Sequence, residues 1–259
     1  MGLLRRTIAK VKRDGLPATI AGAVAAARAA LDFRYRAAYG RMLQRGDMQD
    51  RFTAIYDQNL WSSGESGSGL GSEVEFTRNL RGWLVEKVPH YGIETFVDAP
   101  CGDFNWMRLV LPQLEIDYVG LDIVESVVQA NTARYGTERT RFAVANICED
   151  PIPPCDLLMV RDCLFHLSYA DISRFLANLA ATDFRYLLTT THLTDQAFAN
   201  RDITSGDFRL IDLCKPPFGF DPATVIDQVD DFPPRFTAPR RMVLIAKADV
   251  PAGLDRAKG

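Results

Sequence analysis

The chain has 259 residues, enough for one large α/β domain with its own buried core. Hydrophobic residues make up 47% and charged residues 24%, which excludes a disordered or collagen-like chain. The net charge of -3 argues against bulk attraction to nucleic acid, so no nucleic-acid partner is expected. The charge is uneven, because residues 1–51 carry 11 Lys/Arg against 4 Asp/Glu while the remainder carries 19 against 29.

The five cysteines form an odd set without a C-x-x-C pair, and the chain has only three histidines. A structural zinc site is poorly supplied with ligands in such a sequence, so no metal is expected. Reduced thiols in a cytoplasmic protein are the simplest interpretation of this pattern.

Residues 1–60 are expected to form a basic helical extension, followed by a single domain over residues 61–259. The basic start and the run LPATIAGAVAAA resemble a secretion signal. That run has twelve residues, whereas a bilayer crossing needs about 20, and three arginines follow it. Two interpretations stay open: an Ala-rich helix that packs on the body, or a basic segment over residues 1–45 that weakly contacts the inner face of an anionic membrane.

Helical residues 15–60 are followed by the loop Ser62–Ser72, SSGESGSGLGS, which we call the Ser/Gly loop. Ser72-x-x-Glu75 predicts a capping box for a helix through Val88. Short apolar strands then alternate with helices, which predicts a mostly parallel sheet covered on both faces. The predicted strands are 94–99, 117–121, 141–145, 156–160 and 186–191, and the predicted helices are 103–111, 125–135 and 168–181.

The C-terminal part has a different pattern. Residues 192–220 are irregular and rich in Asp, Arg, Pro and Gly. Residues 225–229 and 241–248 are expected to pair as a terminal hairpin.

Open α/β sheets bind ligands beyond the carboxyl ends of their strands. The first strand ends in FVDAPCGDFNWM, which has one glycine, Gly102, where a dinucleotide fingerprint has three. A pyrophosphate needs glycines for close backbone approach, so the glycine count argues against an NAD oxidoreductase. Asp98, at this strand end, suits an ammonium group or its bound water.

The next three strands also end in polar residues. The second strand ends in YVGLD, which places Asp122 to accept hydrogen bonds from both hydroxyls of a ribose. The third ends near Asn146, whose amide can read an adenine edge. The fourth continues as MVRDCLFHL, which brings Arg161, Asp162 and His166 to the same edge.

In this order and spacing, FVDAPCG, YVGLD, FAVANI and LLMVRD resemble the class I S-adenosylmethionine (SAM)-dependent methyltransferases over about Thr95–Thr191. The resemblance implies a Rossmann-like α/β fold, a seven-stranded, mostly parallel sheet with helices on both faces. More narrowly, WSSGESGSGLGS, DAPCGDFNW and GDFRLIDL resemble bacterial methyltransferases associated with polysaccharide and glycan modification. The chain departs from the broad family in its missing glycines around Asp98.

The resemblance implies SAM as cofactor and methyl transfer to a small-molecule or glycan-like acceptor. The N-P-P-Y type signature of amide-nitrogen methylation is absent after the fourth strand, which favours oxygen as the target. A non-catalytic SAM-binding or interaction module with the same fold is the alternative. The residues expected to bind the cofactor are Asp98, Ala99, Gly102, Trp106, Asp122, Ile123, Asn146, Ile147, Arg161, Trp61 and Ser66.

The candidate catalytic residues are His166, Asp162 and His192. Asp162 and His166 are four residues apart, so on a helical turn they share a face. A histidine near its ordinary pKa of about 6.5 can take a proton from a hydroxyl acceptor. Arg209, in the irregular segment, is expected to hold an anionic substrate group. The structural alternatives are a helix cap for Asp98, a turn residue for Asn146, a satisfied loop histidine for His192 and a surface arginine for Arg209.

Overall fold

The structure is a computed structural model that describes residues 38–44, 46–231 and 239–255, of which residues 38–43 are helical. Most of the basic N-terminal segment, with its predicted membrane contact, lies outside the described residues. The compact unit that contains the sheet spans Gly46–Gly259. No helix within the described ranges is both long and apolar enough to cross a membrane.

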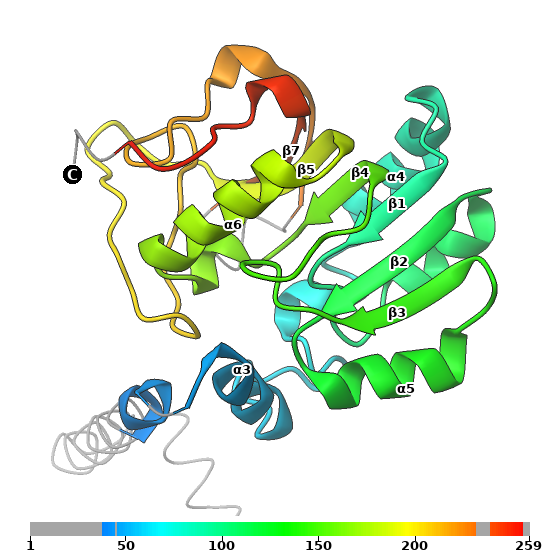
Figure 1. Ribbon diagram of the computed structural model, residues 1–259, viewed down its shortest axis with the longest axis horizontal. Coiled ribbons are helices and arrows are strands. Elements are labelled where there is room, and N and C mark those ends of the chain that lie inside the picture. Colours follow the sequence, from blue (N-terminus) through cyan, green and yellow to red (C-terminus); the bar gives the residue numbers. More distant parts are fainter. Residues whose placement is uncertain (1–37, 45, 232–238, 256–259) are drawn as a thin grey trace, which may run out of the picture. The chain divides into compact units, whose positions relative to one another are not determined.

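A seven-stranded sheet forms the centre of this unit and confirms the expected Rossmann-like fold class (Figure 1). The strand order is β3-β2-β1-β4-β5-β7-β6. β1 to β5 are parallel, whereas β7 runs antiparallel between β5 and β6, which confirms the terminal hairpin. The strands are β1 (Thr95–Asp98), β2 (Asp117–Asp122), β3 (Thr140–Val144), β4 (Cys155–Val160), β5 (Phe184–His192), β6 (Val225–Asp230) and β7 (Arg240–Ala246).

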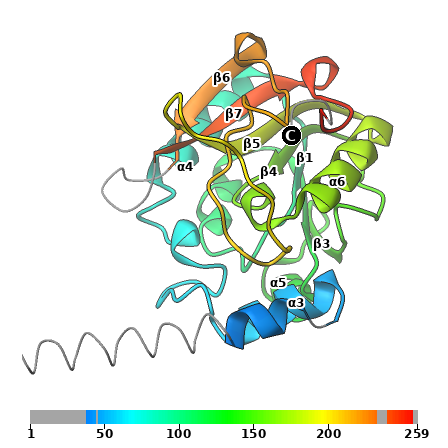
Figure 2. The ribbon, with the colours of Figure 1, turned by 90° about the vertical axis from the view of Figure 1, so that its left-hand side faces the viewer.

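Alternate strand residues build a hydrophobic core on each face of the sheet, because successive side chains point to opposite faces. Phe96 and Val97 are neighbours on β1 but belong to different cores. α6 (Tyr169–Ala181) packs on the core of Val97, and α4 (Arg78–His90) packs on the core of Phe96. Figure 2 shows these two helices on opposite sides of the sheet, and Figure 1 shows α5 (Glu125–Tyr135) beside β3.

α6 begins where the sequence predicts. The Ser168 side chain accepts a hydrogen bond from the backbone N–H of Asp171, which satisfies a donor at the start of the helix. The helix buries one stripe of apolar side chains at helical spacing, and this stripe attaches it to the sheet. The stripe consists of Ile172, Phe175, Leu176 and Leu179.

α4 begins later than predicted, at Arg78 with Thr77 in the N-cap position. Ser72 instead ends a 3-10 turn, Leu70–Ser72, and its carbonyl accepts a hydrogen bond from the Asn105 side chain at 3.0 Å. The predicted capping box at Ser72 is therefore wrong, because the segment is held by the loop after β1.

The helix predicted over residues 103–111 is also wrong. Phe104 has a φ of 60°, a left-handed conformation that an α-helix does not contain. Only the short 3-10 turns Met107–Leu109 and Leu111–Gln113 form in this region. The Asp103 side chain, which would cap such a helix, is used by the Ser/Gly loop.

α3 (Met48–Asp57) lies beyond the carboxyl ends of β2 and β3 (Figure 1). Asp47 and Asp50 cap its first turn reciprocally, with side chain to backbone distances of 2.9 and 3.3 Å. The helix buries Met48 and Ile55, so it is held against the unit by its apolar face. This position makes α3 one wall of the site described next.

Candidate active site

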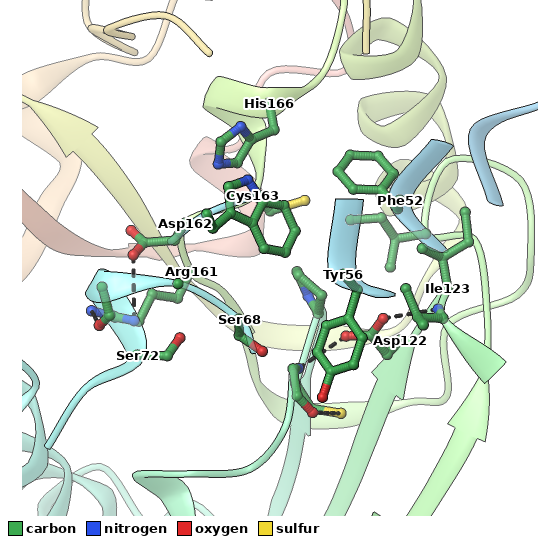
Figure 3. A pocket seen from close by; sticks show the side chains of 18 of the residues that line it. Phe52, Tyr56, Ser68, Ser72, Asp122, Ile123, Arg161, Asp162, Cys163 and His166 are labelled. Atoms are coloured by element: carbon green, nitrogen blue, oxygen red, sulfur yellow. Dashed lines mark hydrogen bonds and ion pairs between the residues drawn. The ribbon is translucent and has the colours of Figure 1, made fainter. Parts of the chain in front are cut away.

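A cavity of about 280 Å³ opens at the carboxyl edge of the sheet, where β1 and β4 are neighbours. Asp98 and Asp122, the last residues of β1 and β2, line one end of it. In Figure 3, Tyr56 lies next to Asp122, whereas Asp162 and His166 lie together at the other end. We call these the acidic end and the acceptor end.

The Ser/Gly loop folds onto the turn after β1. The Ser68 hydroxyl accepts a hydrogen bond from the backbone N–H of Asp103 at 2.9 Å, and the Asp103 carboxylate accepts from the Ser66 hydroxyl at 2.9 Å. Gly102 has a φ of 55°, and a Cβ there would lie 2.4 Å from Ser68 Oγ. Glycine is therefore required at position 102, because part of the chain itself lies against this turn.

Asp122 is 7% exposed at the end of β2. One of its oxygens accepts from the N–H of Gly102 and the other from the N–H of Val124, both at 2.9 Å. Burial raises the pKa of Asp122 to about 6, although these backbone donors oppose the shift. Each oxygen keeps a second lone pair, so the carboxylate can still accept hydrogen bonds from hydroxyl groups.

Asp98 is the second carboxylate of the acidic end and is 2% exposed. It accepts a hydrogen bond from the Tyr118 hydroxyl at 2.8 Å. Burial raises the pKa of Asp98 to about 7, while Tyr118 and the positive Arg161 oppose the shift. A cationic ligand beside Asp98 would favour its ionised form.

A buried ion cluster of Arg161, Asp162, Asp231 and Arg240 borders the cavity. Arg161 Nε donates to Asp231 at 2.9 Å, and Arg240 Nη2 donates to Asp162 at 2.7 Å. Burial opposes ionisation of Asp162, but the two arginines outweigh it and hold its pKa below the usual value. Burial raises the pKa of Asp231 to about 6 against the same two arginines. When ionised, the two cations and two anions cancel.

The Ser/Gly loop closes over this ion cluster. The Gly71 carbonyl accepts a hydrogen bond from Arg161 Nη2 at 2.8 Å. A Cβ at position 71 would lie 2.4 Å from Asp162 Oδ2, so a side chain there would collide with the cluster. Glycine thus allows close packing at two places, Gly71 within the loop and Gly102 in the turn after β1 that the loop contacts.

His166 ends the 3-10 turn Leu164–His166 after β4 and lines the cavity. Its Nδ1 lies 2.8 Å from the Asp207 carbonyl oxygen. Because a carbonyl only accepts, Nδ1 carries the proton and Nε2 is the acceptor. Burial lowers the pKa of His166 to about 4, although the Asp207 carbonyl and the Asp162 charge oppose the shift. The expected ordinary pKa is therefore wrong, and the ring is neutral at pH 7.

Aromatic side chains surround His166. The ring centroids of Phe165, Trp61 and Phe208 lie 4.6, 5.6 and 5.9 Å from its ring centroid. Phe52 of α3 extends the group, 6.4 Å from Trp61. We call Phe52, Trp61, Phe165 and Phe208 the aromatic wall; all four line the cavity.

Most of the site residues predicted from sequence meet in this cavity. Two of the predicted cofactor residues do not line it: Ala99 donates its N–H to the Met159 carbonyl at 2.9 Å within the sheet, and Ser66 is bonded to Asp103. The predicted residues that do line it are Trp61, Asp98, Gly102, Trp106, Asp122, Ile123, Asn146, Ile147, Arg161, Asp162 and His166.

His192 and Arg209 also lie outside the cavity lining. His192 is 2% exposed, and its Nδ1 lies 3.2 Å from the backbone nitrogen of Ile211. Arg209 is 1% exposed, and its guanidinium donates to the carbonyls of Leu164 and Leu167. Arg209 therefore holds residues 206–209 against the turn of His166, and the expected contact with an anionic substrate group does not fit its position.

Several lining residues were not identified from sequence. Phe52 and Tyr56 lie in a recognised helical stretch, but only the position of α3 brings them to the cavity. Phe208 lies in the irregular segment beside Arg209, and only the pairing of residues 206–209 with the turn of His166 brings it there. No local sequence pattern indicated Arg240 as a site residue, since its partner Asp162 is 78 residues away in the sequence.

The lining fits SAM. The ion cluster balances its own charge, so Asp98 and Asp122 leave an excess of carboxylate that suits a cation and disfavours a pyrophosphate. Ile123 and Ile147 add apolar walls suited to a flat adenine ring. Within the described residues, no group of three or more His, Cys, Asp or Glu has an arrangement that could hold a metal ion.

No protein-family model matches the chain, and no curated protein matches its sequence. Solved structures of methyltransferases match its fold. The 1,6-didemethyltoxoflavin N1-methyltransferase of Burkholderia thailandensis, solved with 1,6-didemethyltoxoflavin and S-adenosylhomocysteine, is 17% identical with a TM-score of 0.57. That match covers 76% of this chain and 86% of the other.

Two further structures give the same result. Magnesium protoporphyrin IX methyltransferase of Synechocystis PCC 6803, with S-adenosylhomocysteine bound, is 14% identical with a TM-score of 0.52, over 76% of this chain and 97% of that one. A SAM-dependent methyltransferase of Leishmania major is 16% identical with a TM-score of 0.54, over 78% and 87% of the two chains. The chain therefore has the class I methyltransferase fold.

Proposed function

We propose that the protein is a SAM-dependent methyltransferase that methylates a hydroxyl oxygen of a small-molecule or glycan-like acceptor. The observation that carries this proposal is the cavity at the β1–β4 edge, with excess carboxylate at one end and an uncharged proton acceptor at the other. The class I methyltransferase fold supports the same assignment.

The acidic end is the proposed cofactor site. Asp122 accepts hydrogen bonds from the ribose hydroxyls, and Asp98 stabilises the ammonium group directly or through water. Ile123 and Ile147 contact the adenine, whose amino edge Asn146 reads. Gly102 and Trp106, with Trp61 from beside the Ser/Gly loop, complete the enclosure, and Arg161 orients Asp162. When bound, SAM supplies an electrophilic methyl group on a sulfonium.

The acceptor end orients the hydroxyl and receives its proton. His166 Nε2 is the proposed acceptor, since Nδ1 is held by the Asp207 carbonyl. Asp162 is less suited, because Arg240 and Arg161 stabilise its ionised form and weaken it as a base. Positioning of the hydroxyl supplies much of the remaining rate enhancement.

Binding and turnover test the proposal separately. SAM or S-adenosylhomocysteine should raise the melting temperature, and at 100 times its Kd the ligand should stabilise the fold by about 2.7 kcal/mol. NAD is the control and should give no shift. Labelled methyl transfer to an acceptor from extracts then separates an enzyme from a non-catalytic SAM-binding module. A folded protein that gives no shift with saturating SAM overturns the proposal.

We also propose a cytoplasmic location with weak peripheral contact to the inner face of the membrane through residues 1–45. The basic excess over residues 1–51 supports this contact, because each Lys or Arg near an anionic surface contributes about 1 kcal/mol. Flotation with phosphatidylserine-containing vesicles tests it. Equal recovery of the full-length protein and a variant lacking residues 1–45 would contradict the contact.

A further inference from the structure

Apolar side chains at the acceptor end are left exposed to solvent. Leu70 and Phe208 are each 47% exposed and both line the cavity. Leu70 stands between Gly69, where a Cβ would approach Trp61, and Gly71, where a Cβ would approach Asp162. Leu70 therefore belongs to the same end of the cavity as the aromatic wall. Exposed apolar surface gathered at a cavity mouth indicates an apolar ligand.

The charged groups at this end already have partners. Arg240 donates to Asp162, Arg161 donates to Asp231 and to the Gly71 carbonyl, and the charges of the cluster cancel. An anionic acceptor would find no uncompensated cation among the described lining residues. A sugar would bring several hydroxyl groups to a wall of rings and Leu70, where burying them without hydrogen bonds is unfavourable.

Among the described lining residues, His166 Nε2 is the ring acceptor at this end and the buried Trp61 Nε1 is a donor without a hydrogen-bond partner, and the orientation of His166 is set by the chain. His166 is held by the Asp207 carbonyl at Nδ1, and the His166 carbonyl accepts from the N–H of Gly206 at 2.8 Å. Arg209 secures the same segment through the carbonyls of Leu164 and Leu167. These contacts place Phe208 and His166 side by side, one apolar and one a hydrogen-bond acceptor.

We propose that the acceptor is a neutral aromatic molecule with one ring hydroxyl, bound among Trp61, Phe165 and Phe208 with its hydroxyl donating to His166 Nε2. This inference rests on the proposed function and narrows its acceptor class. In the transfer, the oxygen of the hydroxyl group forms a bond to the methyl carbon, and the carbon–sulfur bond of SAM breaks with its electron pair left on sulfur. The hydroxyl proton passes to His166 Nε2 and then to water, so the products are an aryl methyl ether and S-adenosylhomocysteine.

The test uses the full-length protein saturated with S-adenosylhomocysteine, whose binding is measured first by calorimetry. Phenol, 2-naphthol and 7-hydroxycoumarin are then titrated, with methyl β-glucoside and maltose as sugar probes. We expect binding of at least one hydroxyaromatic probe and none of the sugars. The same probes are tested for transfer with labelled SAM.

Variants locate the binding. Phe208→Ala should weaken binding of the hydroxyaromatic probe about 3–10-fold, as for loss of an aromatic pair, and Phe208→Tyr should restore it. Leu193→Ala is the matched control, because Leu193 is 41% exposed and lies outside the cavity lining. His166→Ala should lower kcat more than it raises KM, since the ring contacts remain.

The outcomes distinguish failure of the proposed function from failure of the aromatic acceptor alone. Failure of S-adenosylhomocysteine to bind overturns the proposed function. If the cofactor binds normally, any of three results overturns the aromatic acceptor and leaves SAM binding intact. These results are binding of sugars alone, no binding of a hydroxyaromatic probe, or equal effects of Phe208→Ala and Leu193→Ala.

Discussion

Burial shifts pKa values in opposite directions at the acidic end and at the acceptor end of the cavity. At the acidic end, burial raises the pKa of Asp98 to about 7 and that of Asp122 to about 6. At the acceptor end, burial lowers the pKa of His166 to about 4. In each case the low-dielectric surroundings favour the neutral form. A cationic ligand can reverse this effect at the carboxylates, whereas a neutral acceptor leaves the histidine uncharged.

The ion cluster at the acceptor end is expected to give the largest effect. Arg161→Met removes one of the two cations that compensate the buried carboxylates of Asp162 and Asp231. The loss should lower the free energy of unfolding by about 3–5 kcal/mol. Urea denaturation measures the loss. Arg78→Met, which breaks an exposed pair with Glu75, is the control and should cost far less. Similar losses for both variants would contradict a stabilising cluster.

The acceptor end predicts a loss of turnover. His166→Ala should lower turnover by about 100-fold, the lower part of the range for general bases, because a pKa of about 4 makes a weak base at pH 7. Steady-state transfer of labelled methyl groups measures it. SAM affinity should be unchanged, and His90→Ala, at the exposed end of α4, is the control. Loss of folding or of SAM binding would give His166 a structural role.

The acidic end predicts a loss of affinity. Asp122→Asn removes the charged acceptor proposed for the ribose hydroxyls, and bonds to charged groups contribute about 1.5–3 kcal/mol. SAM should then bind about 10–150-fold more weakly by calorimetry. Asp117→Asn lies at the other end of β2, is exposed, and should leave affinity unchanged. If both variants bind SAM like the parent, the cofactor does not contact Asp122.

The pH dependence of SAM affinity is the smallest expected effect. Below their pKa values of about 7 and 6, Asp98 and Asp122 must lose protons to stabilise a cation, so affinity should rise with pH. We expect a rise of about tenfold between pH 5.5 and 7.5, with proton release below pH 7. Calorimetry in two buffers of different ionisation enthalpy measures both quantities. Asp98→Asn should flatten the profile, and a flat parent profile would contradict the ionisation of these carboxylates on binding.

Much of the fold and of the acidic end was predictable from the sequence. Short apolar strands alternating with helices require a parallel sheet with two cores, and the carboxyl ends of parallel strands meet at one edge. Asp98, Asp122 and Arg161 directly end or follow such strands, so their place in the cavity depends on local sequence alone. The position of Gly102 in the turn after β1 was predictable for the same reason.

The acceptor end was decided by tertiary structure. Phe208, His166 and Trp61 come from three separate segments, and Asp162 meets Arg240 across 78 residues of sequence. No local pattern encodes such pairings, since each depends on how loops pack once the sheet has formed. The pKa of His166 likewise follows from burial and from the Asp207 carbonyl. The sequence alone thus determined the sheet and the carboxylates at its edge, whereas packing of distant segments determined the aromatic wall, the balanced ion cluster and the protonation state of His166.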